Sequence, residues 1–223
     1  MRFTGRSAMN RKYVLFDFDG TVSDTSEGII NSAIYALEKF GITCEDRRAL
    51  CRFIGPPLYD SFVEFYGFSD EMSRKAVGFF RERYNTVGIY ESRMYDGIDV
   101  LLHKLKDCGR HIMIVSSKAE ECIKELLRLY NIADCFEFVA GASDAVGRTK
   151  EDVMRYAVGV GGADVSKAVM VGDTKYDIKA ARLFGIKSVG VTYGFGTVRE
   201  LEDAGADYIA DSVAETEKII LKL

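Results

Sequence analysis

The sequence predicts an α/β fold, in which a parallel β-sheet carries helices on both faces and a separate helical domain follows the first strand. Two observations predict it. Short apolar runs rich in β-branched residues alternate with amphipathic helical patterns from about residue 94 onwards, whereas only helical patterns occur between the first strand and that point. Strict alternation of strand and helix is typical of a parallel sheet that is covered on both sides.

The predicted sheet begins with the apolar run 13–16, which ends in acidic residues and a glycine. Such a run indicates a buried parallel strand whose last residues reach the carboxyl edge of the sheet, where open α/β sheets bind their ligands. Five further strands are predicted at 111–117, 136–141, 167–173, 188–194 and 207–211.

The helices predicted among these strands are 98–109, 119–131, 150–161, 175–185 and 197–205. Several of them end at a glycine, such as Gly109, Gly185 and Gly205. Glycine adopts the left-handed conformation that closes many helices, so these residues support the predicted helix ends.

The helical region after the first strand predicts a cap over that strand's carboxyl end. Its helical stretches are 27–41, 45–55, 58–67 and 70–85. We therefore expect a core domain made of residues 1–24 and 94–223, and a cap domain made of residues 25–93. The segment IGPPL, 54–58, holds both prolines of the chain and predicts a stiff turn between cap helices.

The charge balance argues against a polyanionic partner. The chain has 223 residues, of which 34 are acidic and 30 basic, giving a formal charge of -4. Nothing in this balance draws the molecule to a nucleic acid polymer or a membrane, so we expect a small-molecule partner. The sequence leaves open whether the chain is a monomer or a homodimer.

The cysteines and the N-terminus favour a cytoplasmic protein. The five cysteines are scattered and form no CxxC pair, so we expect reduced core thiols rather than disulfides or a zinc site. The first residues lack the apolar segment of a signal peptide, and no run approaches membrane-spanning length. Because Met9 lies shortly before the first strand, residues 1–8 are either a disordered extension or an artefact of start-codon choice, and the sequence leaves both open.

Two pairs of acids follow predicted strands. Asp17 and Asp19 are two residues apart at the end of the first strand, and Asp173 and Asp177 follow a later one. If both strands lie centrally in one sheet, the four carboxylates meet at its edge, where hard oxygen ligands suit Mg²⁺. A single Asp in such a place is commonly only a helix cap or turn residue, which is how Asp24 and Asp144 are interpreted.

Four motifs resemble those of the haloacid dehalogenase-like hydrolase superfamily, in the same order. They are FDFDGTVSDT (16–25), VSSK (115–118), the region of Lys150, and GDTKYD (172–177). The similarity runs from about Lys12 over essentially the whole chain and implies a Rossmann-like core. The insertion matches the cap of the group that contains phosphoglycolate phosphatase, β-phosphoglucomutase and 5'-nucleotidase-like enzymes. FIGPPLYDSF (53–62), GVTYGFGT (190–197) and RELEDAGADY (199–208) are most similar to the phosphoglycolate phosphatase and 5'-nucleotidase-like branch.

The resemblance implies catalytic roles for the first acid pair. Asp17 would be the nucleophile that forms an aspartyl-phosphate, and Asp19 the general acid and base. Gly20 would permit a sharp turn in which Thr21 makes a hydrogen bond. Asp19 also argues against dehalogenation, because the dehalogenases of the superfamily lack this residue.

Further residues are implied to hold the phosphoryl group and the metal. Ser116 would bind a phosphoryl oxygen, with backbone N–H groups around Phe18, Asp19 and Ser117 as additional donors. Ser117 is also expected to cap the next helix in a capping box with Glu120. Asp173 would bind Mg²⁺, and Asp177 would hold it through water or orient Lys150.

Lys150 is the lysine implied to neutralise charge at the nucleophile. In many members of the family a proline follows this lysine, whereas here no proline follows Lys150. Lys118 and Lys167 also lie near strand ends, so they remain alternatives, although a solvated surface lysine is the default interpretation of each.

The function predicted from the sequence is Mg-dependent hydrolysis of a small, phosphoglycolate-like phosphomonoester. A 5'-nucleotidase, a pyrophosphatase and a β-phosphoglucomutase-type enzyme remain alternatives, as does a phosphate-responsive regulatory protein without turnover. Cap residues of FIGPPL or the basic Arg52 would set specificity. His103 and His111 are expected to be structural or surface residues, so a Ser-His-Asp hydrolase is poorly supported.

Overall fold

The computed structural model describes residues 12–143, 146 and 149–223, and it confirms the predicted α/β fold. The predictions for residues 1–8 and for Asp144 concern positions outside this part of the chain. Within it, the main sheet has six parallel strands in the order β5-β4-β1-β6-β7-β8. These strands are β1 (Tyr13–Phe16), β4 (His111–Ala119), β5 (Phe138–Ala142), β6 (Ala168–Gly172), β7 (Lys187–Val191) and β8 (Tyr208–Ala210).

The central strand β1 lies between β4 and β6, and its register positions the acids. Phe16, the last residue of β1, is paired with Val171 of β6 on one side and with Ile114 of β4 on the other. The residues that follow these pairs therefore lie side by side near the carboxyl edge of the sheet. This places Asp17 next to the end of β6 and close to the serines of β4.

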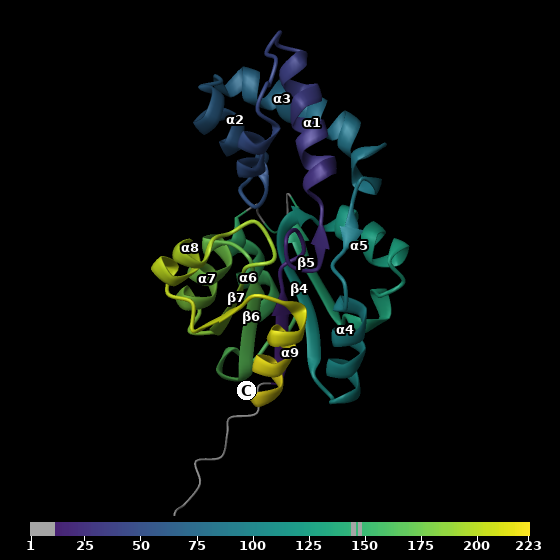
Figure 1. Cartoon of the computed structure of the whole chain (residues 1–223), viewed down its shortest axis with the longest axis vertical. Helices are drawn as coiled ribbons and strands as arrows, with labels where there is room; N and C mark the ends of the chain where they lie inside the picture. Colours follow the sequence, from purple (N-terminus) through teal and green to yellow (C-terminus); the bar gives the residue numbers. More distant parts are fainter. Residues whose placement is uncertain (1–11, 144–145, 147–148) are drawn as a thin grey trace, which may run out of the picture.

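Side chains of the central strands alternate between two apolar layers. Val14 and Phe16 belong to one buried cluster, whereas Leu15 belongs to another, as the two-residue period of a strand requires. Helices cover both layers in Figure 1. They are α4 (Ile98–Asp107), α5 (Glu120–Leu129), α6 (Lys150–Gly159), α7 (Lys175–Leu183), α8 (Val198–Ala204) and α9 (Val213–Lys222), of which α9 was not predicted.

Glycines close three of these helices as predicted. Gly205 is the left-handed C-cap of α8, with φ at 91°. Gly109 and Gly185 follow the C-caps of α4 and α7, and both have φ near 70°.

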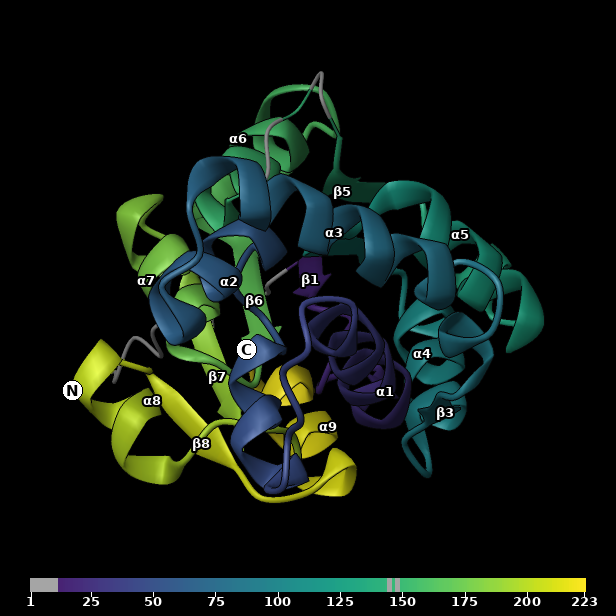
Figure 2. The same cartoon turned by 90° about the horizontal axis from the view of Figure 1, so that it is seen from above.

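The predicted helices of the insertion stand above the carboxyl edge of the sheet (Figure 1), and from above they cover its central strands (Figure 2). They are α1 (Ser26–Glu38), α2 (Leu58–Tyr66) and α3 (Asp70–Tyr84). The segment 54–58 forms the predicted turn before α2. The predicted helix 45–55 is instead a 3-10 helix, η1 (Arg47–Phe53), which cannot continue because Pro56 follows closely.

A short antiparallel ribbon joins the two ends of the insertion. Its strands are β2 (Ser23–Asp24) and β3 (Arg93–Met94), and a further 3-10 helix, η2 (Gly88–Tyr90), precedes β3. The sequence analysis did not predict this ribbon. The division into a core domain and a cap domain at residues 24 and 94 stays a prediction, although both boundaries fall at the ribbon.

The cysteines are free thiols, but the expectation that all are core residues is wrong. Cys135 is buried in η3 (Ala133–Cys135), whereas Cys108 is exposed at the end of α4. None of the helices in the described part of the chain is both long enough and apolar enough to span a membrane.

Candidate active site

Three carboxylates meet at the carboxyl edge of the sheet. Asp17 follows β1, Asp173 follows β6, and Asp177 lies in the first turn of α7. One oxygen from each lies within 4.8 Å of the others, and all three residues are buried. The β1–β6 register and the short turn into α7 together produce this cluster.

Two glycines give the acids the space they need. Gly20 has φ at 82°, and a Cβ at this position would lie 2.1 Å from Asp173 Oδ2. A Cβ at Gly172 would lie 2.3 Å from the Asp177 carboxyl carbon. A side chain at either position would push an acid out of the cluster.

Lys150 lies between two of the carboxylates. Its Nζ is 2.7 Å from Asp17 Oδ1 and 2.7 Å from Asp177 Oδ1, and it donates a hydrogen bond to Val115 O at 3.1 Å. Lys150 begins α6, where Thr149 and Asp152 form a reciprocal capping box. This box fixes the start of α6 at Lys150, although no proline follows the lysine.

The alternative lysines lie elsewhere. Lys167 is paired with Asp164, and its side chain is 50% exposed. Lys118 is buried and contacts Asp19 rather than Asp17, so the interpretation of Lys118 as a surface residue is wrong. Of these three lysines, Lys150 alone forms an ion pair with Asp17.

Burial makes the carboxylate cluster electrostatically costly. Desolvation, reinforced by repulsion from Asp177, raises the pKa of Asp17 to about 6, although Lys150 opposes this rise. Desolvation, followed by repulsion from Asp177 and Asp17, also raises the pKa of Asp173 well above its ordinary value. Burial alone lowers the pKa of Lys150, but the two acids outweigh it, so the lysine stays charged.

Asp19 lies apart from the other acids. Its Oδ1 accepts a hydrogen bond from Thr25 Oγ1 at 2.8 Å and one from Lys118 Nζ at 3.0 Å. The structure therefore brings three of the four predicted acids into one cluster and gives Asp19 a separate set of partners. A role for Asp19 as a metal ligand stays a prediction.

The predicted phosphate ligands lie close to the cluster. Ser116 is buried within β4, three residues before the strand ends at Ala119, and its hydroxyl helps to lower the pKa of Asp17. Ser117 lines the cavity above the site, whereas the Phe18 side chain is buried in the core. The capping role of Ser117 is wrong: β4 continues to Ala119, which becomes the N-cap of α5 without a side-chain hydrogen bond.

The sequence analysis missed a loop that encloses Asp173. Phe195 N donates to Asp173 Oδ2 at 2.8 Å, and a Cβ at Gly194 or Gly196 would collide with Asp173. Thr21 Oγ1 donates to Asp173 Oδ1 at 3.2 Å, so it bonds across the site rather than only within its own turn. Gly194 at the end of the predicted strand 188–194 and Gly196, with one residue between them, were the available signal.

The carboxylate cluster fits a divalent cation. Asp17 Oδ1 and Asp177 Oδ1 are buried, and Lys150 Nζ is the partner that the described part of the chain gives to each of them. Each keeps lone pairs for another ligand. Three buried carboxylates form the hard oxygen donor set that Mg²⁺ prefers.

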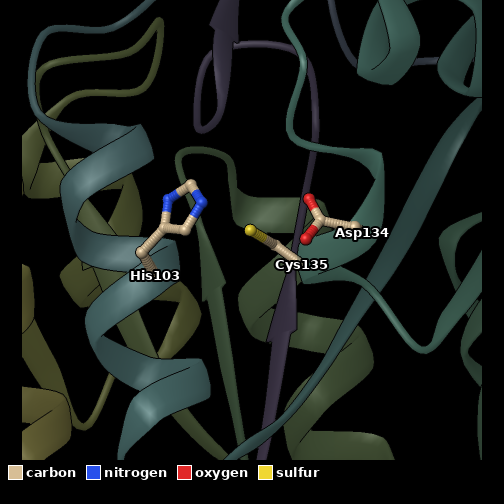
Figure 3. Close-up of side chains that lie close together, drawn as sticks. All are labelled: His103, Asp134 and Cys135. Carbon is tan, nitrogen blue, oxygen red and sulfur yellow. The ribbon is translucent and has the colours of Figure 1, made fainter.

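A second cluster of side chains (Figure 3) is less suited to bind a metal ion than the carboxylate cluster. It consists of His103 on α4 with Asp134 and Cys135 on η3. Asp134 is already paired with Lys106 at 2.7 Å, and burial raises the pKa of the Cys135 thiol, which favours the protonated form. We assign no metal site to this second cluster. The other histidine, His111, lies at the amino end of β4, away from the carboxylate cluster.

A cavity of about 570 Å³ lies between the carboxylate cluster and the insertion. Its floor includes Asp17, Asp19 and Ser116, and residues 55–58 of the predicted turn line one side. The wall formed by the insertion is largely apolar and aromatic. It includes Ile29, Phe53, Val77, Phe80, Tyr84 and Ile89.

Arg52, proposed as a specificity residue, lies outside the set of residues that line this cavity. Its guanidinium group is 4.3 Å from the centre of the Phe65 ring.

Replacing Asp17 by asparagine should stabilise the metal-free protein at pH 8. The folded-state pKa of about 6 exceeds the ordinary 3.8, so the stability that protonation of Asp17 provides is present in full below about pH 4 and is lost as pH rises through 6. An asparagine stays neutral and should gain about 1 to 3 kcal/mol in free energy of unfolding.

Denaturant unfolding with a chelator, at pH 5 and pH 8, measures this gain. Asp60→Asn, at an exposed position of α2, is the control. A less stable Asp17→Asn protein at pH 8 would show that the attraction to Lys150 outweighs the burial cost.

The chain is similar to known proteins in sequence and in structure. The family model described as haloacid dehalogenase-like hydrolase matches residues 14–191. A 5'-nucleotidase of Pseudomonas aeruginosa is 35% identical over 210 residues, which are 93% of this chain and 95% of the relative. A pyrophosphatase of Bacillus velezensis is 31% identical and covers 91% of this chain and 93% of its own length.

The fold is also that of known structures. The crystal structure of a predicted phosphatase from Clostridium acetobutylicum matches this chain with a TM-score of 0.92. The two sequences are 44% identical, and the match covers 95% of this chain and 99% of that chain. The family match spans most of the chain and both of its acid pairs, and the resemblance inferred from the motifs is confirmed. The chain belongs to the haloacid dehalogenase-like hydrolase family.

Proposed function

We propose that the protein is a Mg²⁺-dependent phosphatase that hydrolyses a phosphomonoester through an aspartyl-phosphate on Asp17. The observation that carries the proposal is the Asp17 carboxylate at the floor of the cavity, held by Lys150 at 2.7 Å beside two further buried acids. The relatives named as 5'-nucleotidase and pyrophosphatase support a phosphoryl group as the substrate.

In the first step, an Asp17 oxygen attacks phosphorus and the bond from phosphorus to the leaving oxygen breaks. Asp19 gives its proton to that oxygen. In the second step, water attacks the phosphorus, Asp19 takes a proton from this water, and the Asp17 carboxylate is released together with phosphate. The same residue thus serves first as acid and then as base.

Other residues orient the nucleophile and the phosphoryl group. Lys150 fixes Asp17 Oδ1 and places a positive charge next to the transferred phosphoryl oxygens. Ser116 is positioned to donate to one of these oxygens. Asp17, Asp173 and Asp177 would hold Mg²⁺, which would offset negative charge on the phosphoryl group.

The cavity supports a substrate larger than phosphoglycolate. Phosphoglycolate and pyrophosphate carry a second anionic group near the transferred phosphorus, where Lys150 and Lys118 are already paired with acids. Most of the wall formed by the insertion would solvate that second anion poorly, and Arg81 is the one cation of the described insertion residues that lines the cavity. We therefore favour an uncharged leaving group with a flat ring, as in a nucleoside 5'-phosphate, over the phosphoglycolate-like substrate predicted from the sequence.

Phosphate release should require both the metal and Asp17. We expect Mg²⁺-dependent release of phosphate from a chromogenic phosphomonoester. The rate of release should fall at least a hundredfold on chelation of the metal and at least a thousandfold in the Asp17→Asn variant. Acid quenching during turnover should trap a phosphoenzyme in the wild type only. Activity that persists in Asp17→Asn would remove this residue as nucleophile, while activity without metal would contradict the ligand set.

The aromatic wall should select the leaving group. Phe80→Leu should lower kcat/KM for a nucleoside 5'-phosphate by about fivefold, because a flat ring contact is lost, and change kcat/KM for phosphoglycolate less than twofold. Phe79→Leu is a matched control, since the neighbouring Phe79 contacts Phe40 and does not line the cavity. Higher wild-type kcat/KM for phosphoglycolate or pyrophosphate than for any nucleotide would reject this substrate class.

A further inference from the structure

Lys118 is a buried lysine that connects Asp19 to the insertion. Its side chain is only 6% exposed, and its Nζ lies 3.0 Å from Asp19 Oδ1. The same Nζ donates a hydrogen bond to the hydroxyl of Tyr84 and lies 4.6 Å from the centre of that ring. These three residues come from the loop after β1, from β4 and from the last position of α3.

The contacts of Asp19 reach the insertion by two routes. Thr25, immediately before α1, donates to Asp19 Oδ1 directly, and Tyr84 at the end of α3 holds Lys118 against the same oxygen. In the described part of the chain, Thr25 and Lys118 are the side chains bonded to the Asp19 carboxylate. Without Lys118, one hydroxyl would be the remaining side-chain restraint on the orientation of this carboxylate.

The electrostatics of the contact keep Lys118 charged. Burial alone lowers the pKa of Lys118, but the Asp19 carboxylate and the Tyr84 hydroxyl outweigh this effect and leave the pKa above its ordinary value. Burial raises the pKa of Tyr84 to about 12, so Tyr84 remains a neutral phenol at physiological pH. A charged donor that is removed from water makes a strong, directional bond to a carboxylate.

We propose that Lys118 is a positioning residue that directs the Asp19 carboxyl group toward the leaving oxygen, and that Tyr84 makes this orientation depend on the placement of α3. The proposal rests on the proposed function, because that function assigns the proton transfer to Asp19. Displacement of a proton donor by about 1 Å can cost on the order of a hundredfold in rate.

A comparison of two leaving groups isolates this role. Nitrophenolate leaves readily without a proton, whereas an alkoxide needs one, so misplacing Asp19 should affect alkyl phosphates selectively. We expect Lys118→Met to lower kcat/KM for a nucleoside 5'-phosphate by roughly tenfold to a hundredfold. For p-nitrophenyl phosphate the loss should stay below about threefold, and the inhibition constant of vanadate should change equally little.

The Tyr84 contribution is tested by a double mutant. Tyr84→Phe removes the hydroxyl that holds Lys118. It should lower kcat/KM for the nucleoside 5'-phosphate selectively, by about a third of the factor found for Lys118→Met. The double variant should match Lys118→Met alone, because Tyr84 acts through the lysine. The control Tyr35→Phe loses a hydroxyl bond to Glu82 elsewhere in the insertion and should leave both substrates unaffected.

The outcomes separate this proposal from the proposed function. Equal losses for both substrates in Lys118→Met would assign Lys118 to the phosphoryl group or to general stability and would overturn the positioning role. Additive losses in the double variant would overturn the link to α3. If Lys118→Met does not fold, the selectivity of Tyr84→Phe decides. A wild type that releases phosphate from neither substrate would reject the proposed function, and the positioning role with it.

Discussion

The ion pair of Lys150 with Asp17 and Asp177 is the interaction on which the site depends. Parallel pairing of β1 with β6 brings three carboxylates into a buried space, where their repulsion would otherwise drive them apart or protonate them. One ammonium group against three carboxylates leaves a formal charge of −2 when all are ionised. One divalent cation would balance that charge, so the strand register that brings the carboxylates together also produces the charge that a metal ion would neutralise.

The second ion pair divides the floor of the cavity into two electrostatic units. Lys118 and Asp19 neutralise each other, whereas the cluster around Asp17 retains excess negative charge. The charged unit suits a cation and a phosphoryl group, and the second unit contains the residue that we propose for proton transfer. The strands on either side of β1 supply the partners: β6 leads to Asp173, while β4 provides Ser116 and Lys118.

The sheet, its covering helices and the convergence of the acids could be predicted because they depend on local patterns. Alternating apolar runs identify strands, and an acid directly after such a run must lie at the carboxyl edge. Contacts between distant segments were not predictable in this way. The interpretation of Lys118 as a surface lysine failed because the lysine contacts Tyr84, which lies 34 residues earlier in the chain and could not be placed beside it from the sequence. The capping role of Ser117 failed similarly, because pairing with β5 extends β4 past it.

The position of the insertion explains why its helices and the proton-transfer residue are linked. The chain leaves the core a few residues after Asp19 and returns through β3, which pairs with β2 directly before Thr25. Any movement of the helices relative to the sheet must therefore be absorbed close to Asp19. Asp17 follows β1 at the edge of the sheet and is held by Lys150 of α6, so the proposed nucleophile is held by the core. In the proposed mechanism, Asp17 stays fixed while the orientation of Asp19 depends on the position of the insertion. Closure of the insertion over the substrate would then be coupled to proton transfer.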